Sequence, residues 1–170
     1  MIGMAMLSVL FTPKGVRKKN EFHYAPIIEV AVLFAGIFIT MVPALLILEA
    51  RGAEIGVRSP LHFFWVTGSL SSFLDNTPTY VTFLALAQGL AASTNLPQEI
   101  IGIPTRILSA ISLGSVFMGA MTYIGNGPNF MVKSICQHHG VKMPSFFGYM
   151  RWSLLILMPL FLIITLIFFI

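Results

Sequence analysis

The sequence predicts an all-α integral membrane protein with about three full transmembrane helices, one re-entrant helical hairpin and one broken helix. Hydrophobic residues occupy 56% of its 170 positions and charged residues only 9%, a balance that is not typical of a soluble domain. Apolar runs near twenty residues long can cross a hydrocarbon core of roughly 30 Å. Two such runs are interrupted by similar phrases, DNTPTY at 75–80 and GNGPNF at 125–130, each with Asn two residues before Pro and an aromatic residue at its end.

The first segment, residues 1–25, joins a short apolar run to a basic loop. Residues 1–11 are too few to span a bilayer, and the basic residues follow this run instead of preceding it, unlike in a signal peptide. We expect 1–11 to be the end of a helix whose beginning is missing, and the rest of the segment to be a cytoplasmic loop. Its basic residues are Lys14, Arg17, Lys18 and Lys19.

The remainder, residues 26–170, is expected to form a transmembrane unit. Residues 26–48 and 152–170 have the length of full spans, and 104–130 has the length of a span that breaks near its end. As one straight helix, 61–92 would be about 48 Å long, too long for the hydrocarbon core even when tilted. As two arms it can enter the membrane and return, so we predict a re-entrant hairpin.

The basic residues favour this hairpin. If 61–92 turns back, the loops 12–25 and 131–151 lie on one side of the membrane and hold most of the basic residues, leaving Arg51, Arg58 and Arg106 on the other side. The positive-inside rule therefore favours a hairpin that enters from the outer face. Basic residues that cluster at membrane edges do not indicate nucleic-acid binding.

Asp75 is the strongest candidate for chemistry because it lies at the predicted hairpin tip, near the middle of the membrane. An ionisable group at that depth costs roughly 2.5–3.5 kcal/mol on insertion scales and indicates function by default. A carboxylate there can exchange a proton for Na⁺ at one place, which is the simplest basis for antiport. Alternatively, Asp75 caps the second arm of the hairpin. The two roles are compatible.

Neutral oxygen atoms surround both breaks and suit a hard cation such as Na⁺. The side chains that carry them are Asn76, Thr77 and Thr79 at the first break and Thr122, Asn126 and Asn129 at the second. Gly125 and Gly127 are expected to turn backbone carbonyls inward.

Four small residues near the breaks are expected to be structural. Ser71 and Ser72 should bond to carbonyls of their own helix. Gly114 and Gly119 should allow a neighbouring helix to pack closely.

Two stretches resemble a known family of carriers. SSFLDNTP at 71–78 resembles the Ser-rich, Asp-Asn-x-Pro hairpin of sodium/proton antiporters in the ion-transporter superfamily, which also holds citrate, dicarboxylate and arsenite carriers. GAMTYIGNGPNF at 119–130 looks like the broken helix that follows this hairpin in the C-terminal half of such carriers. The resemblance covers about 1–170 and implies half of an inverted-repeat transporter, with the N-terminal half missing from this chain.

The resemblance also implies roles for individual residues. The expected ion-binding residues are Asp75, Asn76, Thr77, Thr79, Asn126 and Gly127, with Na⁺ held by Asp75 and Asn76. The expected substrate-binding residues are Thr122, Pro128 and Asn129. The carboxylate carriers typically have a Ser-Asn-Thr hairpin tip. Asp75 replaces its first residue here, which favours a cation and proton substrate over a citrate-like anion.

Three functions remain open from the sequence. The first is Na⁺/H⁺ antiport through competition at Asp75, the second is Na⁺-coupled transport of a citrate-type or dicarboxylate anion, and the third is a membrane assembly subunit without transport activity. An intramembrane enzyme is not expected, because an aspartyl protease needs a second deep carboxylate and a serine protease needs a base beside its nucleophile. Cys136, the single cysteine, provides no disulfide or metal motif.

The expected surroundings follow from this fold class. We expect a multi-pass protein of the bacterial inner membrane, with Na⁺ as the transported or coupling ion and no other cofactor. Its expected partners are the lipid bilayer and the N-terminal half of the carrier, with a homo-oligomer left open and no nucleic acid.

Overall fold

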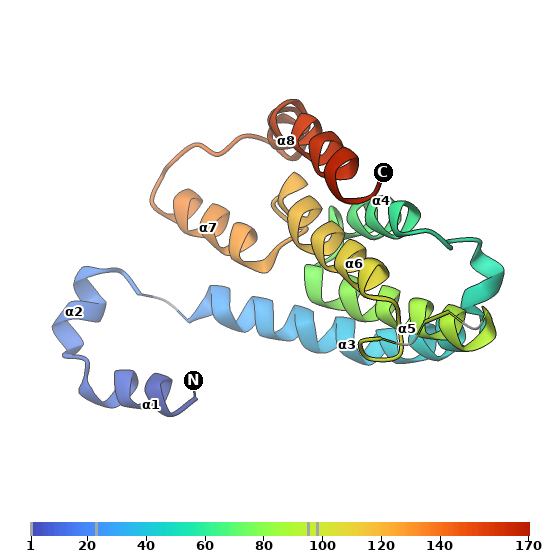
Figure 1. Ribbon diagram of the computed structural model, residues 1–170. Coiled ribbons are helices and arrows are strands. Elements are labelled where there is room, and N and C mark those ends of the chain that lie inside the picture. The colour runs from blue at the N-terminus through green and yellow to red at the C-terminus, as the bar shows by residue number, and fades with distance from the viewer. Residues whose placement is uncertain (1, 23, 95, 98) are drawn as a thin grey trace. The chain divides into compact units, whose positions relative to one another are not determined.

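The described part of the chain is helical, as the sequence predicts. The computed structural model describes residues 2–22, 24–94, 96–97 and 99–170, and Figure 1 shows helices joined by turns and loops over these ranges. The chain divides into two compact units, Met1–Leu33 and Phe34–Ile170. The helices are α1 Ile2–Phe11, α2 Lys14–Lys19, α3 Ala25–Arg51, η1 Gly52–Ile55, α4 Pro60–Ser71, α5 Asn76–Thr94, α6 Thr105–Met118, η2 Gly119–Met121, α7 Gly127–His138 and α8 Phe146–Phe168.

The first unit contains α1, α2 and the start of α3. Apolar and small residues make up α1, and none of its residues is buried. Arg17 connects α2 to both of its neighbours along the chain. Its Nη1 donates to Tyr24 Oη at 3.0 Å, and its Nη2 donates to the carbonyl oxygen of Ser8 at 2.9 Å. The side chain of Arg17 therefore holds α2 against the last turn of α1.

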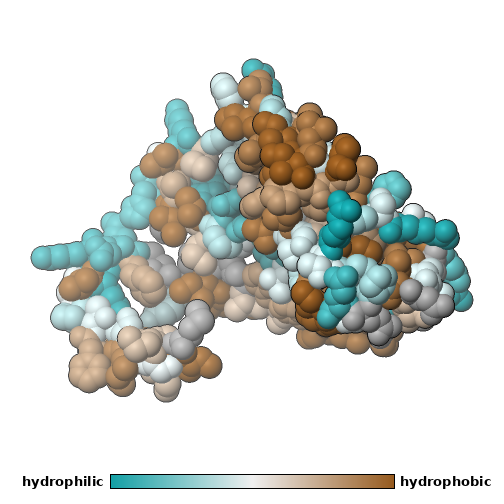
Figure 2. Space-filling view, in the orientation of Figure 1, coloured by the Kyte–Doolittle hydropathy of each residue, from teal (hydrophilic) through white to brown (hydrophobic). Residues whose placement is uncertain are grey.

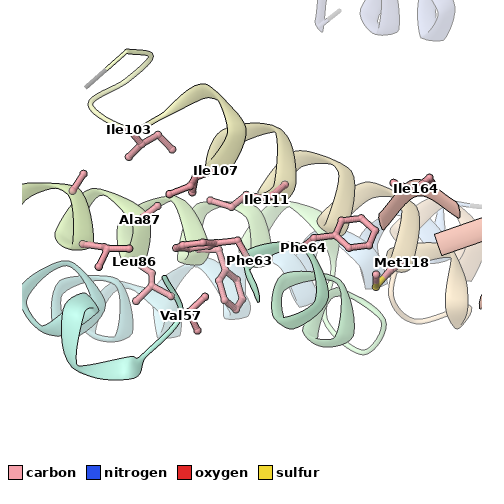
Figure 3. Close-up of a cluster of buried hydrophobic side chains, with 14 of the residues drawn as sticks. Val57, Phe63, Phe64, Leu86, Ala87, Ile103, Ile107, Ile111, Met118 and Ile164 are labelled. Carbon is pink, nitrogen blue, oxygen red and sulfur yellow. The ribbon is translucent and has the colours of Figure 1, made fainter. Parts of the chain in front are cut away.

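The core of the second unit lies between α4, α5 and α6, which contact one another. Gly114 allows α4 and α6 to approach closely, since a Cβ atom built there would lie 2.6 Å from the carbonyl oxygen of Phe64. The expected close packing at Gly114 is thus confirmed. In the expected membrane setting, close van der Waals packing of side chains stabilises such a core, since lipid supplies no hydrophobic driving force between helices. Figure 3 shows the contributors, among them Phe63 and Phe64 from α4, Leu86 and Ala87 from α5, and Ile107 and Ile111 from α6.

Serine side chains mark the start of two helices. Ser59 Oγ accepts from the N–H of His62 at 3.3 Å, and Pro60 opens α4 without needing a donor there. Ser145 Oγ accepts from the N–H of Gly148 at 3.2 Å at the start of α8. This cap explains why α8 begins at Phe146; the crossing expected at 152–170 falls largely within this helix.

Among the described residues, α8 is the one helix that is long and apolar enough to cross a membrane by length and composition. Its 23 residues give a length of about 35 Å. Figure 2 shows hydrophobic residues over α8 on the visible face. Shorter apolar helical segments are Ile2–Phe11, Phe34–Pro43 and Thr105–Met121. The three crossings and the re-entrant course of 61–92 therefore stay predictions.

Candidate functional site

A hairpin turn brings the first polar phrase to the ends of two helices. The two helices α4 and α5 occupy most of the range 61–92 and are joined by residues 72–75. The turn is held by backbone bonds from the N–H groups of Phe73 and Leu74 to the carbonyl oxygen of Leu70, at 3.1 and 2.9 Å. Asp75 follows as the residue before α5. We call residues 71–76 the hairpin tip.

A second, longer interruption separates α6 from α7, as Figure 1 shows. The chain leaves η2 with an extended Thr122 (φ −131°, ψ 161°) and enters α7 from an extended Asn126 (φ −152°, ψ 121°). Pro128 lies in the first turn of α7, where the missing N–H of proline has no helical partner to lose. We call residues 122–126 the break. This segment is not helical, so its backbone groups lack the regular hydrogen bonds of a helix.

Asp75 links the tip to the break through its carboxylate. The N–H of Thr77 donates to Asp75 Oδ1 at 3.2 Å, and the N–H of Gly127 donates to Asp75 Oδ2 at 2.9 Å. These N–H groups belong to the first turns of α5 and α7, where the helix dipole is positive. One carboxylate thus serves the N-termini of two helices that are far apart in sequence. The capping role that we weighed for Asp75 exists and extends to a second helix.

The amide of Asn76 makes the next set of links. We assign its nitrogen to the position that faces carbonyl oxygens, because an oxygen there would meet only acceptors. In this orientation Nδ2 donates to the carbonyl oxygens of Ser115 and Gly125, both at 2.9 Å, while Oδ1 accepts from Asn126 Nδ2 at 3.2 Å. Asn76 therefore joins α6, the break and the start of α7. The Gly125 carbonyl faces inward, as expected, but it is bound by an amide.

Two serines of the tip bond across to the neighbouring helix. Ser71 Oγ donates to the carbonyl oxygen of Ser115 at 2.6 Å, so the expectation that it bonds within its own helix was wrong. Ser72 Oγ lies 3.0 Å from the carbonyl oxygen of Gly68 in its own helix and 3.0 Å from that of Met118. The expectation was therefore half right for Ser72. Because α4 packs closely against α6, carbonyl oxygens of α6 lie within hydrogen-bonding distance of both serines.

Thr122 closes the contact from the side of the break. Its hydroxyl donates to the carbonyl oxygen of Ser72 and accepts from the N–H of Gly125 at 3.0 Å. Only 1% of Thr122 is exposed. Its hydroxyl therefore has two protein partners, and its position is fixed by the tip on one side and by the break on the other.

Glycine is required at two positions of this contact. A Cβ atom at Gly125 would lie 2.6 and 2.7 Å from the carbonyl oxygens of Ser71 and Ser72, and one at Gly119 would lie 1.9 Å from the terminal amide group of Asn76. Real Cβ atoms essentially never come within 3.0 Å of another heavy atom in this way. The expected close packing at Gly119 is confirmed, with the hairpin tip as the neighbour.

An aromatic cluster, which the sequence did not reveal, holds the break from its other side. The ring of Tyr123 packs edge-on against Phe146 and Tyr149 of α8, with ring centroids 5.5 and 5.9 Å away. The ammonium of Lys133 lies 4.4 Å from the centroid of the Tyr123 ring, a cation–π distance. The sequence offered one signal for this cluster, which is the position of the aromatic Tyr123 inside the break that precedes α7.

The predicted site residues do not all share one environment. Thr79 is buried, and its hydroxyl donates to the carbonyl oxygen of Asp75 at 3.0 Å. Thr77 and Pro128 are exposed, and Asn129 is half-buried. The tight cluster that the structure brings together consists of Asp75, Asn76, Thr122, Asn126 and Gly127.

The chemistry available in this cluster is that of oxygen ligands. In the part of the chain that the structure describes, no three His, Cys, Asp or Glu residues group as a transition-metal site would need. The oxygens at hand are carbonyls, amides, a hydroxyl and one carboxylate, which suit hard cations. Asn126 Oδ1 is buried and, among the described residues, has no hydrogen-bond partner. A buried acceptor without a partner is costly, and a cation would satisfy it.

Comparisons with known proteins give one family. A family model described as "Putative citrate transport" matches residues 1–169. Neither a curated protein nor a solved structure matches the chain.

Proposed function

The chain belongs to this citrate transport family, and from that premise we propose that it forms the ion- and substrate-binding part of a membrane carrier for citrate-type carboxylates, coupled to Na⁺. Membership of a transporter family makes it a membrane protein with a carrier role. The family is described by citrate transport, and this supports a carboxylate substrate. The coupling to Na⁺ is our addition and rests on the chemistry of the cluster.

The observation that carries this proposal is the contact between the hairpin tip and the break. Chain that leaves helical geometry inside a membrane is tolerated where it lines a cavity or meets a ligand. Here two such segments meet, and Asn126 Oδ1 remains as a buried oxygen without a partner in the described part of the chain. A neutral amide oxygen of this kind can bind Na⁺. Unlike a second carboxylate, it adds no further negative charge that the site would have to neutralise.

We propose that Asp75, Asn76, Thr77, Thr79, Asn126 and Gly127 surround the cation. Asn126 offers its unpartnered Oδ1, and Asp75 offers the lone pairs that the two N–H groups do not use, since an ionised carboxylate has about four acceptor sites. The hydroxyl of Thr77 is exposed and can turn toward an ion. Gly127 contributes through its backbone.

We place the substrate at the other side of the break, near Thr122, Pro128 and Asn129. The exposed ring of Pro128 and the half-buried amide of Asn129 lie in the first turn of α7, next to a helix N-terminus that favours anions. The N–H of Gly127 is already bound by Asp75, so a substrate carboxylate would have to use donors beyond it.

Na⁺/H⁺ antiport is the second candidate, and Asp75 is the observation that favours it. In this cluster Asp75 carries the only acidic side chain, and its carboxylate occupies the point where two helix N-termini meet. A proton or a Na⁺ ion at this carboxylate would compete for the same oxygens. This competition would couple the two ions without an organic anion.

One assay separates the two candidates. The chain is reconstituted into proteoliposomes, with an inward Na⁺ gradient imposed, and both uptake of radiolabelled citrate and the fluorescence of an internal pH dye are recorded. We expect citrate uptake that depends on Na⁺. When citrate is omitted, we expect no Na⁺-driven alkalinisation of the vesicle interior. Na⁺-driven alkalinisation without citrate would favour the antiporter. If neither signal exceeds that of empty vesicles, a non-transporting assembly subunit becomes the better proposal.

The resemblance adds partners to the proposal. A carrier with inverted halves would pair this chain with an N-terminal half in the bacterial inner membrane, each half supplying one hairpin and one broken helix. The reconstitution is therefore run with the chain alone and with a co-expressed N-terminal half. A homo-oligomer is the alternative source of a second hairpin, and the mass of the purified complex distinguishes the two.

A further inference from the structure

Three exposed lysines form a basic patch on α2, outside the site described above. Lys14, Lys18 and Lys19 are exposed along a helix of six residues. Lys14 and Lys18 are four residues apart and therefore neighbours on one helix face, where like charges destabilise the helix. A helix this short has little cooperativity with which to offset the repulsion. An anion held between these side chains would relieve it.

The fourth basic residue of α2 is already used within the chain. The guanidinium of Arg17 binds Tyr24 Oη and the Ser8 carbonyl, and it lies 5.7 Å from the centroid of the Phe22 ring. Its contact with the last turn of α1 is favourable because the C-terminal end of a helix is negative. Arg17 thus fixes where α2 lies, and the three lysines of the patch remain available for an external anion.

The position of the patch along the chain indicates a membrane surface. Every described residue of α1 up to Phe11 is exposed, and nearly all are apolar. A helix that is hydrophobic all round belongs in lipid. Figure 2 shows hydrophobic residues over α1 and hydrophilic ones projecting from α2. The patch follows the apolar run within three residues, and Phe22 and Tyr24, packed edge-on at 4.9 Å, suit the interface between lipid and water.

We propose that Lys14, Lys18 and Lys19 bind the headgroups of anionic phospholipids. The charges are complementary, and the contact between Arg17 and Ser8 holds the patch at the end of an apolar helix, the depth at which lipid phosphates lie. Each lysine near an anionic membrane surface is worth about a fivefold change in association. This proposal is independent of the transport function, since it involves only the first unit.

The test measures lipid preference of the full chain in nanodiscs. Spin-labelled phosphatidylglycerol and phosphatidylcholine are compared by electron paramagnetic resonance, which reports the fraction of each lipid that the protein immobilises. One variant carries Lys14→Gln, Lys18→Gln and Lys19→Gln. The matched control carries Arg51→Gln, Arg58→Gln and Lys142→Gln, which removes the same three charges from positions that are also exposed.

We expect the native chain to prefer phosphatidylglycerol at low salt, and the α2 variant to lose that preference while the control keeps it. The preference should also fall in about 1 M salt, where the Debye length is about 3 Å. An unchanged preference in the α2 variant, or an equal loss in the control, would overturn the proposal. Displacement of the lipid by inorganic phosphate, but not by NaCl at the same ionic strength, would also overturn it, because the patch would then be a site for free phosphate.

Discussion

A single carboxylate, that of Asp75, holds together the two polar phrases of the chain. Each helix N-terminus carries roughly half a positive charge, and Asp75 receives an N–H from two of them. The two contacts fix the orientation of the carboxylate, and they leave lone pairs for a cation. The carboxylate oxygens of Asp75 therefore serve both as helix caps and as proposed ion ligands, and a substitution at Asp75 should affect both roles.

We expect Asp75→Asn to lower the free energy of unfolding by about 1–3 kcal/mol. Asparagine keeps one oxygen for an N–H group, but its amide nitrogen would face the other donor. Thermal unfolding of the purified chain in detergent, with and without Na⁺, measures the loss. Na⁺ should raise the melting temperature of the native chain and leave that of the variant unchanged.

The control for this prediction is Glu54→Gln, which removes an acid from an exposed position in η1. It should melt like the native chain and keep the response to Na⁺. If Asp75→Asn behaves in the same way as Glu54→Gln, the carboxylate of Asp75 is neither a double cap nor an ion ligand.

Glu99 makes a second prediction at the residue scale. The hydroxyl and the N–H of Thr105 donate to Glu99 Oε2 at 2.6 and 3.0 Å, and these bonds, the hydroxyl first, hold the pKa of Glu99 below its ordinary 4.5. The ionised form is thus favoured in the folded chain. Its stabilising effect is present above pH 4.5 and is lost as the pH falls through the lowered pKa.

The variant Glu99→Gln tests this pH dependence. It should melt below the native chain at neutral pH, and the two melting curves should converge as the pH is lowered past the pKa of Glu99. A constant difference between the curves at every pH would show that the carboxylate charge has no part in starting α6.

At the scale of elements, the decisive feature is the close approach of the hairpin tip to the break. A Cβ atom at Gly125 would meet two backbone carbonyls of the tip at 2.6 and 2.7 Å, whereas one at Gly127 would have its nearest neighbour, Asp75 Oδ2, at 3.5 Å. The contacts at Gly125 would force the backbone of the tip and that of the break apart, whereas the contact at Gly127 is an ordinary van der Waals contact. Two glycines separated by one residue thus differ sharply in what they tolerate.

We expect Gly125→Ala to cost about 1–3 kcal/mol of stability and to separate the tip from the break. Gly127→Ala is the matched control and should fold like the native chain, because the first turn of a helix accepts alanine. Hydrogen exchange of the amides at Thr77 and Gly127, read by mass spectrometry, reports the separation. Equal protection in the two variants would contradict the close contact.

The sequence predicted where both helices stop, for a physical reason that is local. Pro78 and Pro128 each lie in the first turn of a new helix, where the missing N–H of proline costs no helical hydrogen bond. The interruptions lie at 72–75 and 122–126, at or just before the two phrases, so their approximate positions could be found without a structure. Close packing at Gly114 and Gly119 was expected because small residues let a neighbouring helix approach.

What the sequence could not reveal is the pairing across the contact. Whether the hydroxyl of Ser71 finds a carbonyl in its own helix or in α6 depends on how closely the two helices pack, and the link from Asp75 to Gly127 joins residues 52 positions apart. The extra turns of α8 before residue 152 likewise depend on a cap, Ser145, that was not among the residues considered. Tertiary contacts of this kind have no local signature.

At the scale of the whole molecule, the prediction concerns topology. A hairpin that enters and returns puts loops 50–59 and 94–103 on one side of the membrane and loop 131–151 on the other. Single cysteines at Glu54, Pro97 and Lys142, all exposed, are introduced after Cys136→Ser and labelled with an impermeant maleimide. The first two should react from one side and the third from the other. Labelling of positions 54 and 97 from opposite sides would rule out the re-entrant hairpin.

The proposed ion site can be tested without transport, by equilibrium binding of ²²Na⁺ to the purified chain in a scintillation proximity assay. We predict saturable binding that is lost in Asn126→Ala, which removes the buried Oδ1, and kept in Asn129→Ala, a matched change three residues further along α7. Equal ²²Na⁺ binding by the native chain and Asn126→Ala, or no saturable binding by either, would contradict a cation site between the hairpin tip and the break.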